Sequence, residues 1–312
     1  MQSSFRQIDS DKRKTEMNEI NYPLEVQKIL NNSKIILVAA IGGGCDILGC
    51  MPIFYDLKKI NKEIVLSDVF LYNLSDKLTE SKNHPGIFYA KNDISEFDSI
   101  NAYKAFPEGF IRSTVNMLPR TGVKDLTRKY QYIVDNAKID TIIAVDCGVD
   151  SLMKGTEIGL GTYLDDLLSV IAIDQVNVKN KILICNSFGT EIEEKLNHEV
   201  ILQNINELVK QDALYGIFSL NKIMDCYKFY KAVCDKAFQY GSSHIHPRLI
   251  KAIEGEQLSN FQMPFMNIWW CFDFHKVAIM KAEYKLLMHT LTFDEVKKIH
   301  RSFVINRSQN NA

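Results

Sequence analysis

A buried strand that leads into three consecutive glycines constrains the fold more than any other feature of this chain. Residues 34–40 (Lys-Ile-Ile-Leu-Val-Ala-Ala) form a continuous apolar run, typical of a strand covered on both faces. Glycines at 42–44 follow, and apolar residues at helical spacing then extend over 47–60, where Pro52 predicts that the regular helix begins close to it. A second strand is predicted over 63–71. Because such strand–helix–strand units cross over right-handed, a parallel sheet is expected.

The same alternation of strand and helix continues along the chain. Further strands are predicted over residues 141–145 and 181–185, and helices over residues 23–31, 125–137, 163–173, 199–210, 225–240 and 293–303. Residues 83–125 hold Pro and Gly with little periodicity and are predicted as loops and short helices around a site. The pattern predicts an α/β class protein with a Rossmann-like, doubly wound, mainly parallel sheet.

The chain divides by composition into a tail and one large domain. Residues 1–21 are expected to be a flexible polar tail, without the apolar core of a secretory signal. Residues 22–312 are expected to form a single α/β domain. Residues 212–312, where the pattern weakens, are interpreted as a C-terminal helical and aromatic cap on the same sheet, and a separate small domain is left open.

Charge and cysteine content narrow the partners and the compartment. Lys and Arg total 37 against 38 for Asp and Glu, so nothing in the balance favours nucleic acid or a membrane. No apolar run is long enough to span a bilayer. The seven cysteines show no C-x-x-C spacing, which argues against a zinc ribbon or disulfide framework and for the reducing cytoplasm. A small-molecule ligand is the expected partner, and a homo-oligomer is left open.

The glycine turn is the first candidate for ligand binding. Gly42, Gly43 and Gly44 let a ligand approach the backbone at the strand end, where open α/β sheets bind their ligands. The third glycine of the dinucleotide fingerprint is replaced by Ile47, which argues against NAD as cofactor, and no Walker lysine follows. Asp46 would repel a phosphate but could hold a divalent cation, an amine or a ribose hydroxyl. The alternative is a plain turn in which Asp46 caps the next helix.

The second candidate is an acidic, glycine-rich segment that follows another buried strand. Between residues 146 and 166 five carboxylates alternate with four glycines: Asp146, Asp150, Glu157, Asp165 and Asp166. Convergent carboxylates repel one another, so they indicate a cation, a shared proton or a basic ligand. Oxygen ligands suit Mg²⁺, Mn²⁺ or Ca²⁺, and Mg²⁺ or Mn²⁺ is the predicted cofactor.

Roles can be assigned within these two segments as hypotheses. Asp46, Asp146 and Asp150 are the predicted metal ligands, and Glu157 is predicted to act as the base, with Asp150 as the second catalytic residue. Ligand contacts are predicted for further residues: Gly148, Ser151, Thr162, Asp68 and Gly189. For some of these a simpler role is open. Thr162 could cap the helix that follows, Asp68 could be a surface aspartate, and Gly189 could belong to an ordinary loop.

Taken together, the motifs resemble a known family. They are Gly42-Gly-Gly-x-Asp46, Val145-Asp-x-Gly-x-Asp-Ser-Leu-x-x-Gly-x-Glu157, and Gly159-x-Gly-Thr162 followed by two aspartates. The combination resembles an uncharacterised bacterial and archaeal domain-of-unknown-function family, over about residues 34–273. The resemblance implies a Rossmann-like fold of one domain and supplies no activity.

Other reactive residues are weaker candidates. A His-x-His pair at 244 and 246 could bind metal but is more typical of polar surface, and Arg112, Arg120 and Arg248 could each meet an anion. Cys45 and Cys147 are disfavoured as nucleophiles because nearby aspartates raise a thiol pKa.

The residues favour an enzyme that binds a nucleotide, sugar phosphate or related metabolite at the carboxyl edge of the sheet. Metal-assisted hydrolysis or transfer is the predicted chemistry. The alternative is a non-catalytic sensor that binds such a ligand and passes a signal through the C-terminal region.

Overall fold

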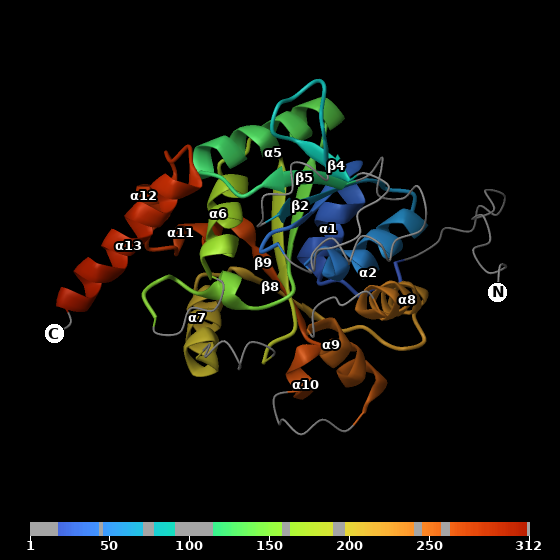
Figure 1. The fold of residues 1–312 in the computed structure, drawn as a ribbon. Helices are drawn as coiled ribbons and strands as arrows, with labels where there is room; N and C mark the ends of the chain where they lie inside the picture. The colour runs from blue at the N-terminus through green and yellow to red at the C-terminus, as the bar shows by residue number, and fades with distance from the viewer. Residues whose placement is uncertain are drawn as a thin grey trace.

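Strands and helices alternate along most of the chain (Figure 1). This computed structural model describes residues 18–43, 46–70, 78–90, 115–157, 163–189, 197–239, 245–256 and 263–310. The strands are β1 (Ile35–Ala40), β2 (Glu63–Phe70), β3 (Leu78–Glu80), β4 (Phe88–Ala90), β5 (Val115–Pro119), β6 (Thr141–Asp146), β7 (Asn180–Cys185), β8 (Leu214–Phe218) and β9 (Trp269–Asp273). The helices are α1 (Leu24–Asn32), α2 (Asp46–Lys59), α5 (Val123–Ala137), the 3₁₀ turn η2 (Asp150–Leu152), α6 (Tyr163–Asp174), α7 (His198–Lys210), α8 (Asp225–Gln239), α9 (Ile245–Glu254), α10 (Met263–Met266), α11 (Phe274–Ile279), α12 (Tyr284–Leu287) and α13 (Phe293–Asn310).

The strands of the described chain form one sheet in the order β3-β4-β5-β2-β1-β6-β7-β9-β8. The central five, β5, β2, β1, β6 and β7, pair in parallel, whereas β3, β4 and β9 each run antiparallel to a neighbour. The parallel part, β5-β2-β1-β6-β7, has the strand order of a Rossmann-like fold, so the predicted fold class is confirmed. The order reverses between β1 and β6, and ligands of open α/β sheets bind at such a reversal, beyond the carboxyl ends of the strands.

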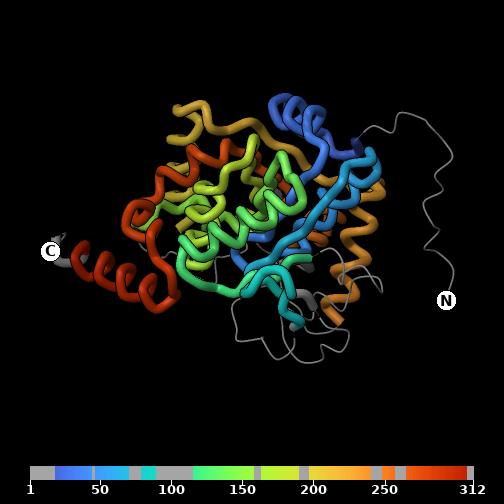
Figure 2. Tube along the Cα trace, turned by 90° about the horizontal axis from the view of Figure 1, so that it is seen from above, coloured from blue at the N-terminus to red at the C-terminus, as the bar shows by residue number. Residues whose placement is uncertain are grey.

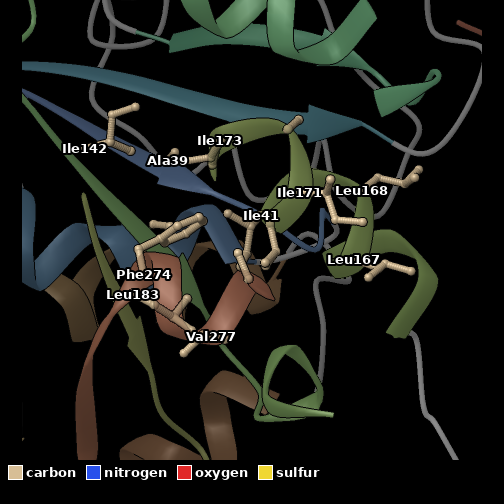
Figure 3. Close-up of a cluster of buried hydrophobic side chains, with 14 of the residues drawn as sticks. Ala39, Ile41, Ile142, Leu167, Leu168, Ile171, Ile173, Leu183, Phe274 and Val277 are labelled. Carbon is tan, nitrogen blue, oxygen red and sulfur yellow. The ribbon is translucent and has the colours of Figure 1, made fainter. Parts of the chain in front are cut away.

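Helices cover both faces of the sheet and bury two apolar cores. One core joins the sheet to α1, α2, α8 and α9, and the other joins it to α5, α6, α7 and α11. Figure 1 shows α2 and α8 on one side of the sheet and α6 and α7 on the other. Figure 3 shows side chains of α6 and α11, such as Ile173 and Phe274, in one buried cluster with Ala39 and Leu183 of the sheet.

The structure corrects three details of the sequence interpretation. Residues 83–125, predicted as loops and short helices, contribute β4 and the parallel strand β5. The predicted C-terminal cap is helical, but it also adds β8 and β9 to the same sheet. Pro52 lies inside α2, six residues after the helix begins at Asp46, rather than near its start.

The C-terminal helix extends away from the rest of the described chain. Figure 2 shows α13, in red, projecting at the edge of the molecule, and its first half carries the buried Val296. The loop that precedes it contacts the start of α5, where the N–H groups of Gly122 and Lys124 donate to the carbonyl oxygens of Leu291 and Thr290. These contacts join the C-terminal helices to α5, which belongs to the second core.

The structure bears on the predictions made from the cysteines and from the lack of long apolar runs. Six cysteines fall within the described ranges, and all are buried free thiols, while Cys45 lies outside those ranges. Across the part of the chain that the structure describes, every helix is too short or too polar to cross a membrane.

Part of the predicted polar tail is attached to the domain. The backbone N–H groups of Glu19 and Ile20 donate to Asp56 Oδ1 at 2.6 and 3.3 Å, and the Glu19 carboxylate pairs with Lys59. Ile20 is buried in the first core. These residues therefore belong with the domain rather than with the tail that the sequence predicts. Burial raises the pKa of Asp56 to about 6 although the two hydrogen bonds lower it.

We expect Asp56→Asn to flatten the pH dependence of folding stability. An acid with a raised pKa stabilises the fold below its ordinary pKa of 3.8, and this contribution is lost as the pH rises through about 6. Asn keeps an oxygen for both N–H groups but cannot ionise. Urea unfolding at pH 4, 6 and 8 should therefore show that the wild type loses about 2–3 kcal/mol more than the variant over this range. Parallel profiles would contradict the expectation.

Candidate functional site

Asp46 joins the ends of the two central strands. It is the first residue of α2, its Oδ2 accepts the Gly42 N–H at 2.7 Å, and its Oδ1 accepts the Cys147 N–H at 3.3 Å. Both donors lie outside α2, so these bonds tie the turn after β1 to the turn after β6. The side chain therefore does more than cap a helix, which was the alternative that the sequence left open.

Asp146 is the last residue of β6 and is held by the turn that follows it. Its Oδ1 accepts the Gly148 N–H at 2.7 Å, and its Oδ2 accepts the Ser151 N–H at 3.3 Å. Gly148 and Ser151, predicted as ligand contacts, thus bond to a predicted metal ligand through their backbones. The turn fixes the direction of the Asp146 carboxylate.

Asp166 completes a group of three carboxylates that we call the aspartate cluster: Asp46, Asp146 and Asp166. Each offers an oxygen, and these oxygens lie within 4.8 Å of one another. Asp166 stands in the first turn of α6 and is 2% exposed, and its Oδ1 accepts no hydrogen bond from the described residues. The cluster therefore draws on three separate elements at the point where the strand order reverses.

Burial and mutual repulsion disfavour the ionised forms of the three carboxylates in the cluster. Burial and then the charge of Asp146 raise the pKa of Asp46 well above its ordinary value, and Asp68 and Asp150 add to the effect. Burial and the charges of Asp150 and Asp146 likewise raise the pKa of Asp166. For Asp146, burial and Asp150 raise the pKa to about 7. A bound divalent cation would remove this penalty.

The glycine turn gives the carboxylates room to converge. A methyl group at Gly42 would lie 2.3 Å from Asp166 Oδ1 and 2.7 Å from Asp46 Oδ2, both closer than atoms can approach. Gly43 adopts a φ of 78°, which favours glycine. Gly44 lies outside the described residues, as does Thr162.

Asp150 and Asp68 lie close to the cluster without belonging to it. Asp150 begins η2 and is buried, and its charge contributes to the raised pKa of Asp146 and Asp166. Asp68 is buried in β2 rather than exposed, and its charge acts on Asp46. The structure therefore groups Asp166, rather than Asp150, with Asp46 and Asp146.

Glu157 is engaged in holding the acidic segment. Its Oε1 accepts the Lys154 N–H and its Oε2 accepts those of Gly155 and Thr156, each at 2.8 Å. The Asn204 amide also donates to Oε1, at 2.7 Å. Burial opposes ionisation, but these bonds outweigh it and lower the pKa of Glu157, which makes it a weaker base. These hydrogen bonds give Glu157 a structural role, and its catalytic role stays a prediction.

We expect Glu157→Gln to destabilise the fold by about 1–3 kcal/mol, because the amide nitrogen of Gln cannot accept the Gly155 and Thr156 N–H groups. Glu207→Gln is the matched control. Glu207 contacts the same lysine, through the Lys154 ammonium at 2.6 Å, but is half exposed, so its loss should cost less than about 1 kcal/mol. Urea unfolding measures both. Equal effects of the two substitutions would contradict the structural role of Glu157.

Lys281 is a buried cation beside the acidic segment that the sequence analysis missed. It follows α11 and is 3% exposed, and its ammonium donates to the carbonyl oxygens of Ser151 and Met153. Burial lowers its pKa to about 8, although the nearby carboxylates of Asp166 and Glu157 oppose the change. The residue lies more than 100 positions from these contacts, so no local pattern indicates its role.

The turn after β7 lies at the same edge of the sheet. The Asn186 N–H donates to the Asp146 carbonyl oxygen at 3.2 Å, and Gly189 has a φ of 100°. Gly189 is therefore near the neighbouring strand end, and its ligand contact stays a prediction.

The weaker candidates are placed as follows. Arg120 pairs with Asp165 at 2.7 Å, so its charge is already matched. Burial and the Asp46 charge raise the pKa of the Cys147 thiol well above its ordinary value, as expected for an unreactive cysteine. Arg112, Cys45 and His244 lie outside the described residues, as does the side chain of His246.

Comparison with known proteins gives one family and no activity. No curated protein matches the chain. A family model described as a protein of unknown function (DUF1152) matches residues 100–305, well over half of the chain. The match includes Asp146, Asp166 and Lys281 but begins after the glycine turn. As the resemblance of the motifs implies, the chain belongs to a family of unknown function, DUF1152.

Proposed function

We propose that this protein is a metal-dependent enzyme that holds Mg²⁺ or Mn²⁺ between Asp46, Asp146 and Asp166. The observation that carries the proposal is the convergence of three buried carboxylates from three elements, with ligand oxygens within 4.8 Å of one another. Asp166 Oδ1, buried and without a hydrogen bond from the described residues, supports it independently. An all-oxygen donor set favours hard cations over Zn²⁺.

The proposed substrate is a nucleotide, a sugar phosphate or a related metabolite. The cluster lies at the reversal of strand order, where Rossmann folds bind such ligands. Half-buried Gly42 brings backbone beside the cluster without a side chain, and a cation there could offset the repulsion between carboxylates and a phosphate. The cytoplasm is the proposed location, because buried free thiols persist in a reducing compartment.

The proposed chemistry is hydrolysis or group transfer assisted by the cation. A bound divalent ion polarises a phosphoryl or carbonyl oxygen and lowers the pKa of bound water. Asp150 is the better candidate for the base, because it lies beside the cluster whereas the oxygens of Glu157 accept backbone N–H groups. A non-catalytic sensor is the second candidate. It is favoured by the contact of Lys281, in the C-terminal region, with the acidic segment.

The test combines binding with turnover. Mn²⁺ binding to the purified chain, followed by electron paramagnetic resonance of the free ion, should show a site that Mg²⁺ competes for. Nucleoside phosphates and sugar phosphates incubated with Mn²⁺ and the protein should yield a product by mass spectrometry. A bound metabolite that stays unchanged would favour the sensor, and absence of Mn²⁺ and Mg²⁺ binding would reject the proposal.

A further inference from the structure

The backbone carbonyl oxygens of residues 151–154 accept hydrogen bonds from groups that are distant in the sequence. The Leu152 carbonyl oxygen accepts the Asn204 amide at 3.1 Å, and the Lys154 carbonyl oxygen accepts the Ala282 N–H at 2.9 Å. The carbonyl oxygens of Ser151 and Met153 accept the Lys281 ammonium. Residues 281 and 282 therefore hold the segment from the C-terminal region.

Ser151 connects this lysine to the aspartate cluster. Its carbonyl oxygen accepts the Lys281 ammonium, while its N–H donates to Asp146 Oδ2 at 3.3 Å. The lysine is further fixed by the Tyr163 ring, whose centre lies 5.5 Å from the ammonium nitrogen. A shift of Ser151 would thus release one of the two N–H groups that direct the Asp146 carboxylate.

We propose that Lys281 is a positioning residue for the cation site, holding Ser151 so that Asp146 faces Asp46 and Asp166. This inference rests on the proposed function. Two physical effects of Lys281 oppose each other and can be separated. Its positive charge repels a cation, so loss of charge alone would tighten binding. Its hydrogen bonds order a ligand, so their loss would weaken binding.

The test measures Mn²⁺ affinity in the full-length chain by electron paramagnetic resonance. Lys281→Met removes the charge and both hydrogen bonds with little change in volume, and we expect it to weaken binding at least tenfold. Lys276→Met is the matched control. Lys276 also donates to two carbonyl oxygens, those of Gln211 and Asp212 at 2.6 and 3.0 Å, and these lie in the segment between α7 and β8. The Mn²⁺ affinity of Lys276→Met should equal that of the wild type.

A second measurement covers the case in which Lys281→Met fails to fold. In the wild type, Mn²⁺ should slow hydrogen exchange of the Ala282 N–H, because binding and positioning are thermodynamically linked. Unchanged exchange on binding, or Mn²⁺ affinity in folded Lys281→Met equal to or above that of the wild type, would overturn the role of Lys281 alone. A wild type that binds neither Mn²⁺ nor Mg²⁺ would overturn the proposed function and this inference together.

Discussion

Replacing Asp166 with Asn is expected to abolish the stabilisation that Mn²⁺ gives to the wild-type protein. Burial and the charges of Asp150 and Asp146 raise the pKa of the Asp166 carboxyl, so its ionised form destabilises the fold at high pH. Asn cannot ionise, and the metal-free variant should therefore be slightly more stable than the metal-free wild type near pH 8. The Asn amide can still take part in the side-chain hydrogen bond that Asp166 makes with Asp150. In the wild type, Mn²⁺ at a hundred times its Kd should add about 2.7 kcal/mol. Thermal unfolding with EDTA or Mn²⁺ measures both effects.

The neighbouring residue supplies the control for this prediction. Asp165 is also an aspartate of the first turn of α6, but its carboxylate pairs with Arg120, which stacks 4.0 Å from the centre of the Phe293 ring. Asp165→Asn should therefore keep the full response to Mn²⁺. Burial raises the pKa of Asp165 although Arg120 lowers it, so the relief of this burial cost should offset most of the lost ion pair, and the free energy of unfolding should fall by about 1 kcal/mol or less. The assignment of Asp166 as a ligand would be contradicted if Mn²⁺ still stabilised Asp166→Asn fully. It would also be contradicted if both variants lost the same share of the stabilisation by Mn²⁺.

Gly42→Ala is expected to abolish cation binding by steric conflict rather than by removal of a ligand. The added methyl group would meet Asp166 Oδ1 at 2.3 Å and Asp46 Oδ2 at 2.7 Å, so both carboxylates would have to turn away. Overpacking of this kind costs about 1–3 kcal/mol of stability. Calorimetric titration with Mn²⁺ should show no binding to the folded variant.

Two further variants separate the causes. Asp46→Asn leaves the volume of the site unchanged and should weaken binding by removing charge. Gly255 has a φ of 76°, and a methyl group added there would have no neighbouring atom within 4 Å. Gly255→Ala should therefore strain the backbone and leave the Mn²⁺ affinity unaltered. Normal Mn²⁺ affinity in folded Gly42→Ala would show that the glycine turn does not border the cation site.

Periodicity along the chain predicted the central sheet well because the local pattern decides it. The apolar runs of β1 and β6 are buried on both faces, those of β2 and β7 are buried over most of their length, and each is recognisable without its neighbours. By contrast β5, with five residues, and β9, with two tryptophans, are short runs whose strand character comes from pairing with distant segments. Pairing of this kind leaves little trace in a single sequence.

For the site, the carboxylates at the strand ends could be predicted from the sequence, but the residues that other elements bring to them could not. Asp46 and Asp146 follow buried strands, and the carboxyl ends of parallel strands meet at one edge. Asp166 belongs to an acidic pair in the sequence, and its helical spacing from the buried Tyr163 and Val170 distinguishes it from Asp165. Lys281 reaches the site only through the folded C-terminal region, so only the structure identifies it.

The central claim is that Asp46, Asp146 and Asp166 bind one divalent cation. Anomalous diffraction at the manganese absorption edge, from crystals grown with Mn²⁺, tests it most directly. The expected result is a peak between the three carboxylates, within about 2.5 Å of an oxygen from each. Peaks only elsewhere on the molecule, or none between these carboxylates at saturating Mn²⁺, would contradict the claim.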